Sequence, residues 1–444
     1  MKAYSNYKDS GVSGIEKIPK DWISEKIKFV ATCNDEVLSD STADDEIINY
    51  VEIGDVDYVN GITNTTEYEF KEAPSRARRI TRPNDIIIST VRTYLKAIAK
   101  ITEPDLIVST GFAVIRPRRI DEVFMSYALL APTFIEEVMS RSFGVSYPAI
   151  KASSLMNIKI CTPPLSEQQE IASFLDAKTK PIDDIIAKRE KQIELLEEMK
   201  SAIISRTVTK GLNIEAKMKD SGIEWIGEIP EGWEMRKLKY ILKSEKYNIK
   251  TGPFGTQLKG NDLREEGDVP VYNQRNVIDN QFHSPSVFVT LDKANELAGF
   301  HTKTNDVLIT SRGTIGKAAI LPNGAKEGIL HPCLIALRIN QDLVNLKYLL
   351  YYINGFEGFA INVFLESNAT TIEVIYTDTL KNIFVTLPQL EEQKRIVSYL
   401  DSETSKIDTR IAKRRKQIEL LQEYKQALIT AAVTGKIDVR EYIP

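Results

Sequence analysis

The sequence of 444 residues has few side chains that could build a disulfide framework or a zinc site. Its cysteines are few and far apart: Cys33, Cys161 and Cys333. This spacing argues against disulfide bonds and for a reducing, cytoplasmic location. Its histidines are equally few and lack the spacing of metal ligands: His283, His301 and His331. We therefore expect ordinary structural histidines and no metal site.

The sequence also lacks a long hydrophobic run. No apolar stretch approaches the roughly 20 residues that a membrane span requires. The opening residues, MKAYSNYKDSG, do not form an apolar signal segment, so we expect no membrane association. The net charge is −4. This mildly acidic value leaves nucleic-acid binding open, because the local distribution of charge decides it.

Motifs for nucleotide, cofactor and nuclease chemistry are missing as well. Residues 311–318, SRGTIGKA, faintly resemble a phosphate-binding loop but lack its first glycine and its final serine or threonine. We find no glycine-rich dinucleotide fingerprint, no Asn/Asp-Pro-Pro-aromatic run of an amino-methyltransferase, and no carboxylate–lysine cluster of a nuclease. The sequence therefore predicts a chain that binds no cofactor and has no catalysis of its own.

What the sequence does contain is an internal repeat, which has to be settled before any fold is assigned. Residues 186–202 (IAKREKQIELLEEMKSA) recur at 411–427 (IAKRRKQIELLQEYKQA), 225 positions later, with thirteen of seventeen residues identical. The preceding segments, 163–171 (PPLSEQQEI) and 388–396 (PQLEEQKRI), share that offset. The openings of the two halves also match, at an offset of 211. The chain is therefore two copies of one design with different middles.

The repeated segment has the apolar spacing of a helix. We expect two helices of about 28 residues, roughly 40 Å long at 1.5 Å per residue, each preceded by a short helix. Pro181 would occupy the first turn of the first long helix, and Gly211 and Gly435 would follow the ends. Imperfect heptad ladders favour packing of the helices on each other over packing of each on its own globular half. The residues predicted to pair are Ile182, Ile186, Ile193, Leu196, Ile203, Ile407, Ile411, Ile418, Leu421 and Leu428.

The two middles have the patterns of strands, turns and short helices. Buried strands are expected at 85–89, 112–116, 306–310 and 334–338, and helices at 123–138 and 346–354. Beyond these elements the two middles diverge strongly in sequence. A fixed framework around divergent loops is typical of a scaffold that positions two different binding surfaces.

Basic and hydroxyl-bearing loops are the candidate binding elements. Residues 75–82, SRARRITR, place four arginines in eight residues of turn-like sequence. Arginine forks, hydroxyls and amides match DNA phosphates and base edges, although any single cation can simply be a solvated surface charge. The candidate DNA-binding residues are Arg76, Arg78, Arg79, Arg82, Arg92, Tyr94, Lys96, Thr251, Phe254, Thr256, Gln257, Arg275, Arg312, Thr314 and Lys317.

Taken together, these motifs resemble the specificity (S) subunit of type I restriction–modification systems. The resemblance covers nearly the whole chain and is strongest in the duplicated proline–Glu-Gln–helix unit, 163–209 and 388–434. The loops 252–258 (GPFGTQL) and 312–316 (RGTIG), and the Ile-Pro…Trp…Lys opening of each half, also look like signatures of that family. The family's base-contacting residues vary with the target, so none is transferred individually.

The resemblance implies an α+β fold with two globular α/β target recognition domains, separated by two long antiparallel helices and related by an internal pseudo-two-fold repeat. The expected boundaries are 1–162 and 212–387 for the recognition domains and 163–211 and 388–444 for the helical spacers. The implied partners are double-stranded DNA, two methyltransferase (M) subunits and restriction/translocase (R) subunits. S-adenosylmethionine, ATP and Mg would be used by those partners and not by this chain.

Three other functions remain open at this point. The chain could be an orphan or alternative S subunit that recognises DNA for a methylation-only system. It could be a self-contained nucleic-acid-modifying enzyme, which the missing motifs disfavour. It could also be a coiled-coil adaptor that binds no DNA, which the arginine-rich loops disfavour.

Overall fold

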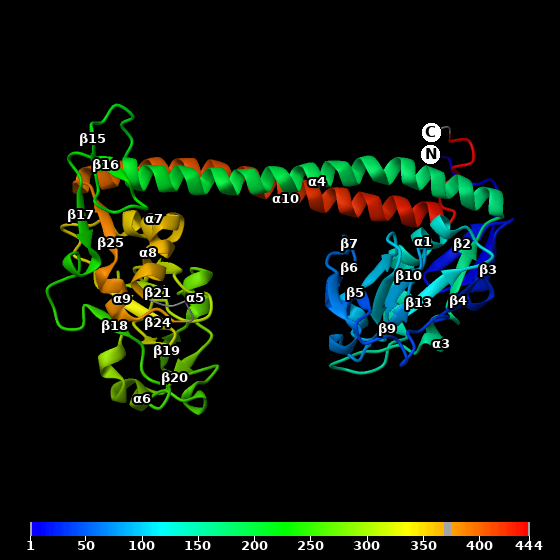
Figure 1. Ribbon diagram of the computed structural model, residues 1–444, viewed down its shortest axis with the longest axis horizontal. Helices are drawn as coiled ribbons and strands as arrows, with labels where there is room; N and C mark the ends of the chain where they lie inside the picture. The colour runs from blue at the N-terminus through cyan, green and yellow to red at the C-terminus, as the bar shows by residue number, and fades with distance from the viewer. Residues whose placement is uncertain (1, 368–373, 443–444) are drawn as a thin grey trace. The chain divides into compact units, whose positions relative to one another are not determined.

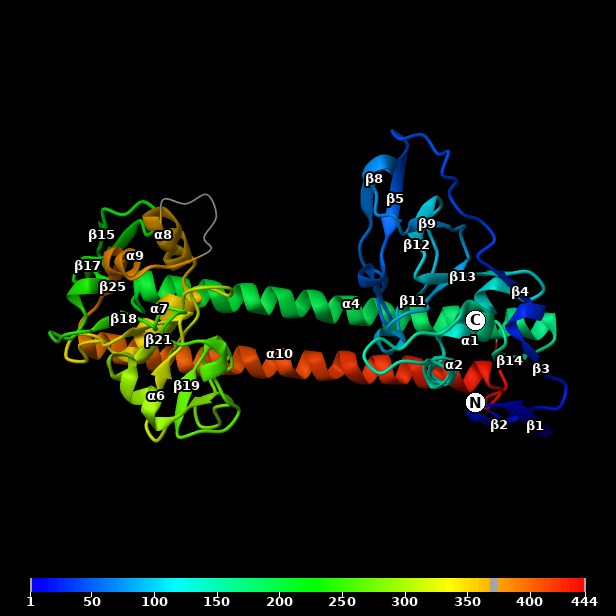
Figure 2. The ribbon, with the colours of Figure 1, turned by 90° about the horizontal axis from the view of Figure 1, so that it is seen from below.

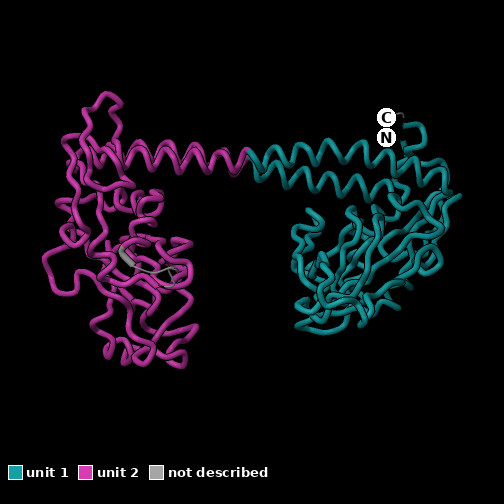
Figure 3. Tube along the Cα trace, viewed as in Figure 1, with its two compact units in different colours: residues 1–191, 414–444 teal, residues 192–413 magenta. Residues whose placement is uncertain are grey.

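The computed structural model of the protein describes residues 2–367 and 374–442. The chain divides into two compact units: unit 1 comprises residues 1–191 and 414–444, and unit 2 comprises residues 192–413 (Figure 3). Two long helices, α4 (Leu165–Lys210) and α10 (Leu390–Val433), each begin in one unit and end in the other (Figure 1). Each unit therefore holds the first part of one long helix and the last part of the other. The linear domain boundaries at 163, 212 and 388 stay a prediction.

The long helices are longer than the sequence predicts. Helix α4 has 46 residues and α10 has 44, because each expected short helix continues without a break into the long one. The expectation for Pro181 is wrong, since this residue lies inside α4 and not in a first turn. A proline inside a helix costs about 3 kcal/mol. Buried residues on both sides, among them Leu175 and Ile182, hold the helix together through it. Both helices end just before Gly211 and Gly435, whose φ angles are +72° and +71°.

The globular part of unit 1 is built on two four-stranded sheets. The first has the strand order β11-β10-β13-β4 and is antiparallel throughout. The second has the order β8-β5-β12-β9, in which β5 runs parallel to β12 and lies beside β8 (Figure 2). The strands are β4 (Ala31–Cys33), β5 (Ile47–Val51), β8 (Thr66–Glu69), β9 (Ala77–Ile80), β10 (Ile86–Ser89), β11 (Ile98–Lys100), β12 (Leu106–Ser109) and β13 (Phe112–Pro117).

Helices and small strand pairs complete unit 1. The single helix expected at 123–138 is two helices, because Pro132 begins a new one at its first position. They are α1 (Glu122–Leu130) and α2 (Pro132–Ser140), followed by α3 (Ala152–Leu155). The strand pairs are β1 (Tyr7–Val12) with β2 (Ile15–Pro19), β3 (Ile23–Lys26) with β14 (Lys159–Thr162), and β6 (Val56–Asp57) with β7 (Gly61–Ile62).

Unit 2 repeats this plan despite its divergent sequence. Its first sheet has the order β18-β24-β21-β22, and its second has the order β20-β19-β23 with β19 parallel to β23. The strands are β18 (Ile249–Thr251), β19 (Val269–Tyr272), β20 (Phe288–Val289), β21 (Val307–Thr310), β22 (Ala318–Ile320), β23 (Ile329–Leu330) and β24 (Leu334–Leu337). The strands expected near 85, 112, 306 and 334 are confirmed as β10, β13, β21 and β24.

The remaining elements of unit 2 are short. Its strand pairs are β15 (Met218–Asp220) with β16 (Glu228–Pro230), and β17 (Glu234–Lys237) with β25 (Phe384–Leu387). Its helices are α5 (Gln274–Ile278), α6 (Leu291–Glu296), α7 (Leu346–Gly355), α8 (Glu357–Ser367) and α9 (Thr377–Asn382).

The ends of the long helices belong to the cores of the globular parts. In unit 1 the core contains Ile171 and Leu175 from the start of α4 together with Ile429 and Val433 from the end of α10. In unit 2 the residues 225 positions away take the same places: Ile396, Leu400, Ile204 and Val208. Each globular part is therefore fixed to two helices at once, one entering and one leaving.

The long helices also pair with each other inside each unit. In unit 1, Lys425 Nζ lies 2.6 Å from Asp183 Oδ1, and in unit 2, Lys200 Nζ lies 2.7 Å from Asp408 Oδ1. The two ion pairs are related by the 225-residue offset, so both units use one antiparallel register.

Among the predicted pairing residues, five are buried and five are half-buried. The buried ones are Ile182, Ile186, Ile407, Ile411 and Leu428, and the half-buried ones are Ile193, Leu196, Ile203, Ile418 and Leu421. Leu428 belongs to the core of unit 1, and Ile203 packs against the core of unit 2. The helices thus combine both packing modes that the sequence left open.

Candidate nucleic-acid interface

The Glu-Gln motif at the start of each long helix ties the globular part to that helix. Gln168 Nε2 donates to the carbonyl of Pro163 (2.8 Å), and its Oε1 accepts from the amide of Asp121 (2.7 Å). Gln393 makes the same two bonds, at 2.9 and 2.7 Å, to the corresponding backbone groups of unit 2. Both glutamine side chains are buried. They satisfy backbone groups that would otherwise be unpaired away from water.

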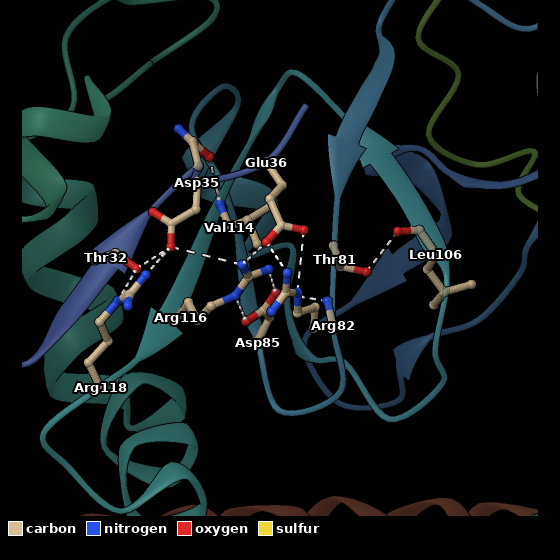
Figure 4. A network of polar contacts seen from close by, with 11 residues as sticks. Thr32, Asp35, Glu36, Thr81, Arg82, Asp85, Leu106, Val114, Arg116 and Arg118 are labelled. Carbon is tan, nitrogen blue, oxygen red and sulfur yellow. Dashed lines mark hydrogen bonds and ion pairs between the residues drawn. The ribbon is translucent and has the colours of Figure 1, made fainter. Parts of the chain in front are cut away.

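A buried carboxylate–arginine pair joins the two central strands of the first sheet in each unit. In unit 1, Arg116 donates to both carboxylate oxygens of Asp85, at 2.9 and 2.7 Å, and to Glu36 at 2.8 Å (Figure 4). Hydrogen bonding to Asp85 raises the pKa of Arg116 above its usual value. In unit 2, Arg338 Nε lies 3.4 Å from Asp306 Oδ1. There, burial raises the pKa of the Asp306 carboxyl even though Arg338 opposes the shift.

At the end of the first sheet away from Asp85 and Arg116, separate backbone hydrogen bonds hold a set of unit 1 loops together. The amide of Thr90, just after β10, donates to the carbonyl of Gly111 before β13 (2.8 Å). The amide of Thr110 donates to the carbonyl of Arg76 (2.8 Å), and the amide of Ile150 donates to the carbonyl of Thr90 (2.9 Å). Loops 74–76, 90–96, 109–111 and 141–149 therefore form one surface, here called the unit 1 loop cluster.

The same end of the first sheet in unit 2 carries a corresponding surface. The amide of Ser311, after β21, donates to the carbonyl of Cys333 before β24 (2.8 Å), as Thr90 does to Gly111. The amide of Gly252 donates to the carbonyl of Leu334 (3.0 Å), and Gln274 Nε2 donates to the carbonyl of Thr314 (3.1 Å). Loops 252–257, 311–317 and 331–333, with the start of α5 at 273–275, therefore form the unit 2 loop cluster.

The arginines of 75–82 do not form a free turn, contrary to expectation. Ala77–Ile80 is strand β9, which pairs with β12. Arg78 is half-buried beside the Phe70 ring, 4.8 Å from its centroid. Arg79 is also half-buried. Arg82 forms an ion pair with Glu36 in the network around Arg116 (Figure 4). Arg78 and Arg82 therefore have structural partners, and Arg79 is partly buried.

Other predicted residues of unit 1 do lie on its loop cluster and are exposed. They are Arg76, Arg92, Tyr94 and Lys96. Among residues 2–367 and 374–442, none of the three cations makes an ion pair, although Arg92 lies over the Tyr147 ring, 5.0 Å from its centroid. These cations are the ones available for phosphate groups.

The predicted residues of unit 2 gather on its loop cluster. Thr251 is half-buried at the end of β18, and Phe254, Thr256, Gln257, Arg275, Arg312, Thr314 and Lys317 are exposed. Two of these side chains have local partners: Gln257 Oε1 accepts from the Phe254 amide (3.1 Å), and Arg275 pairs with Asp279 (3.2 Å). A Cβ on Gly252 would overlap the carbonyl oxygen of His331, which explains the glycine in this loop.

The reasoning from sequence missed the loop 141–149, which brings Phe143, Val145 and Tyr147 to the unit 1 loop cluster. A signal was present in the distribution of acidic residues. The chain has 62 Asp and Glu in 444 residues, one in seven, yet none occurs in 86–102 or in the 29 residues of 138–166. In unit 2, none occurs in 246–261, 269–278, 307–326 or 328–341. These acid-free segments contain most of the cluster loops, and such surfaces suit a polyanion.

Neither a metal centre nor a membrane span is found in the described part of the chain. Across residues 2–367 and 374–442, no group of three or more His, Cys, Asp or Glu side chains could hold a metal ion. His331 Nδ1 and Cys333 Sγ do meet, at 2.9 Å, but as two groups only. None of the described helices is long and apolar enough to cross a membrane.

Comparison with known proteins places these features in a family. The model of the type I restriction modification DNA specificity domain matches residues 19–195 and 230–420. The type I restriction enzyme MjaVIII specificity subunit of Methanocaldococcus jannaschii is 27% identical over 436 residues, covering 96% of this chain and 95% of that protein. The MjaIX specificity subunit of the same organism is 24% identical over 452 residues, covering 96% of each.

A solved chain from work on complex assembly and conformational transition of the type I R-M system has the same fold. It gives a TM-score of 0.67 at 24% identity and covers 95% of this chain and 99% of that one. The chain therefore belongs to the type I restriction modification DNA specificity domain family, as its sequence resemblance predicts. Specificity subunits are the DNA-recognition components of these systems and are not themselves enzymes.

Proposed function

We propose that this chain recognises an asymmetric, bipartite target in double-stranded DNA, with one half-site bound by each loop cluster. The observation that carries the proposal is the presence, in each unit, of an equivalent loop cluster that contains no acidic residue and whose exposed side chains differ from those of the other unit. Equivalent hydrogen bonds at Thr90 and Ser311 build the same surface in each unit. Arginine, lysine, glutamine and threonine on these surfaces have the chemistry of phosphate and base-edge contacts. Because different side chains stand on equivalent backbone frames in the two units, we expect the two half-sites to differ in sequence.

The same proposal includes a scaffold for two methyltransferase subunits, with restriction/translocase subunits joining them. Each unit exposes a pair of large apolar side chains on its long-helix surface: Leu420 and Tyr424 in unit 1, and Leu195 and Met199 in unit 2. The pairs are related by the 225-residue offset. Two corresponding apolar sites support two copies of one partner. S-adenosylmethionine, ATP and Mg would be bound by these partners and not by this chain.

Methylome sequencing of a host with and without this chain, with the methyltransferase partner present in both, tests the DNA-recognition role. We expect deletion to abolish methylation at one split, asymmetric motif, which would give both half-sites and the gap between them. An unchanged methylome would refute the role in that host.

A second experiment tests the helices as the element that sets the gap. Inserting one heptad into both α4 and α10 adds about 10 Å of helix at 1.5 Å per residue. We expect the unrecognised gap to lengthen by roughly three base pairs, at 3.4 Å each. An unchanged gap in the methylated sites would refute this spacing role.

A further inference from the structure

The loop at 141–149 of unit 1 exposes three large apolar side chains at its tip. The exposed fractions are 83% for Phe143, 103% for Val145 and 66% for Tyr147. Scattered single hydrophobic residues on a surface are ordinary, whereas a contiguous apolar tip indicates a binding site. The tip belongs to the unit 1 loop cluster, because Ile150 donates to Thr90 and Thr93 Oγ1 lies 2.8 Å from Ser142 Oγ.

The tip has a defined shape. Phe143 and Ala149 exchange two backbone hydrogen bonds, each 2.9 Å long, which close the loop at its neck. Gly144 has a φ of +113°, and a Cβ there would lie 3.0 Å from the carbonyl oxygen of Tyr147. The loop therefore presents its apolar side chains from a closed backbone, which reduces the entropy lost when they bind.

A cation lies against this apolar tip and a second follows in the same loop, and acidic residues are absent from both loops that build the tip. Arg92 lies over the Tyr147 ring, and Lys96 is exposed at the other end of the short turn Thr93–Leu95. Arg92 and Lys96 have φ angles of +51° and +53°, in the left-handed region. Such strain costs of order 1–3 kcal/mol per residue and gathers at functional sites. Arg92 stacks on the tip and Lys96 lies over the Tyr58 ring, 5.9 Å from its centroid, so one surface offers both apolar side chains and cations, which suits the stacked bases and charged phosphates of a nucleic acid.

We infer that the 141–149 loop acts as an apolar wedge on DNA. Phe143, Val145 and Tyr147 enter a partly unstacked base step in the half-site that unit 1 recognises, and Arg92 and Lys96 contact the flanking phosphates. Proteins that kink duplexes insert apolar side chains in this way and select steps that open easily. The inference rests on the proposed DNA recognition. It adds that this half-site is selected partly by its deformability.

Binding to mismatched duplexes tests the wedge directly. The full chain, assembled with its methyltransferase partner, is titrated with duplexes of the methylated motif in which one mismatched pair is moved through both half-sites. A mismatch already lowers the cost of unstacking, which is a few kcal/mol per step. We expect binding at least about tenfold tighter than to the intact duplex when the mismatch is at the wedge position. This gain should occur in one half-site only.

The variant Phe143→Ser/Val145→Ser/Tyr147→Ser should lose this preference for the mismatched duplex. Ile214→Ser, which also removes a highly exposed apolar side chain but lies in unit 2 outside the loop clusters, is the matched control and should keep it. Equal affinity of the wild-type complex for intact and mismatched duplexes would overturn the wedge and leave DNA recognition standing. A triple variant that no longer co-purifies with the methyltransferase, while Ile214→Ser does, would overturn the wedge and assign the tip to a protein contact instead. Absence of any sequence-specific binding by the wild-type complex would overturn the proposed function itself.

Discussion

The globular parts of the two units agree in their buried contacts and differ in the side chains of their loops, whereas the long helices are nearly identical at 186–202 and 411–427 although most of those residues are exposed. Both bury a glutamine at the start of a long helix, and both pair a buried aspartate with an arginine across the first sheet. Their loop clusters share backbone hydrogen bonds and an arginine and a lysine in the loop after the central strand, but differ in most other side chains. Comparing them separates the residues that build the frame from those available to recognise a ligand. A single copy of this design would not have allowed that separation.

The clusters also reach their loop conformations differently. Unit 2 uses glycine at the left-handed positions of the loop after β21, with φ angles of +68° at Gly313 and +77° at Gly316. Unit 1 uses Arg92 and Lys96 at such positions in the loop after β10. Glycine adopts positive φ without strain, whereas arginine and lysine do not. Unit 1 thus keeps two cations at the cost of strain, which is consistent with a role for those charges.

The largest expected effect concerns the shared frame. Replacing Gln168 or Gln393 with Ala should lower the free energy of unfolding of its own unit by about 2–4 kcal/mol, because several buried backbone groups lose their partners. Hydrogen exchange of the full chain would locate the effect in unit 1 or unit 2. Gln169→Ala removes an exposed neighbour of the same type and is the control. A similar loss in that control would contradict the role of the buried glutamines.

Next in size is the reliance of the unit 2 loop cluster on glycine. Gly252→Ala would force a Cβ against the backbone of His331 and should cost about 1–3 kcal/mol in local stability. DNA binding by unit 2 should weaken with it. Gly255→Ala lies in the same loop, and its Cβ would meet no described heavy atom within 4 Å, so it should be nearly neutral. Equal behaviour of the two variants in hydrogen exchange and DNA titration would refute this account.

The salt dependence of DNA binding can separate the arginines of unit 1 that stabilise the fold from those that bind DNA phosphates. Arg92→Ala should reduce the slope of log K against log salt by about 0.9, the loss of one phosphate contact. Arg78→Ala should leave the slope unchanged, because that side chain is half-buried against Phe70 and lies 3.8 Å from Asp40. Titrations of labelled duplex at several salt concentrations give both slopes. If Arg78→Ala reduced the slope and Arg92→Ala did not, the DNA interface would lie nearer to β9 than proposed.

A smaller effect tests the equivalence of the two helix pairings. Reversing the charge at Lys200 or at Lys425 should cost only about 0.2–1 kcal/mol, because the partner carboxylates are 54% and 51% exposed and solvent screens them. The two variants should lose the same amount in chemical denaturation. Reversing Asp408 or Asp183 as well should restore it. Clearly unequal losses would show that the helix register differs between the units.

The smallest expected effect is a pH dependence of opposite sign in the two units. Burial raises the pKa of Asp35, but hydrogen bonds from Thr32 and Arg118 outweigh it, so the net pKa is lowered. Asp35 therefore stabilises unit 1 above its unfolded pKa of about 3.9, and this contribution is lost as the pH falls through the lower folded value. Asp306 has a raised pKa, so its contribution to unit 2 is present below about 3.9 and is lost as the pH rises through the folded value.

Stability differences between the wild type and the Asp35→Asn and Asp306→Asn variants, measured by hydrogen exchange across this pH range, check the two signs. As the pH rises, the difference should grow for Asp35→Asn and shrink for Asp306→Asn. The same sign for both variants would contradict the assignment.

The sequence predicted the frame well because the frame is repeated. The offset of 225 located both long helices and the Glu-Gln motifs, and the apolar runs located β10, β13, β21 and β24. Pro181 led to a wrong prediction of where the long helix begins. Local propensity disfavours a proline inside a helix, and the tertiary packing that overrides this preference cannot be read from a sequence pattern. The common plan of the two middles was hidden, since different side chains can satisfy the same pleated, half-buried positions.

The candidate interface could be predicted only in part. Four candidate cations follow buried strands, so the sequence alone predicted that they lie in the loops at the strand ends. They are Arg92, Lys96, Arg312 and Lys317. The placement of Arg78 and Arg82 was not predicted, because their partners come from other parts of the chain: Asp40 and Phe70 for Arg78, and Glu36 for Arg82. The apolar tip of 141–149 was missed because it carries one arginine and no repeat, and only a count of missing acidic residues would have marked it.

The placement of the end of α10 in the core of unit 1 has a consequence for synthesis. Residues 1–191 emerge from the ribosome first, yet their core contains Leu428, Ile429, Ala432 and Val433. Unit 2 consists of the contiguous residues 192–413, so all its core residues are translated before the end of α10. The amino-terminal half must therefore wait, with apolar surface exposed, until almost the whole chain has been translated, and it finishes folding after the half that follows it. A chaperone that protects nascent chains would be needed most during that interval.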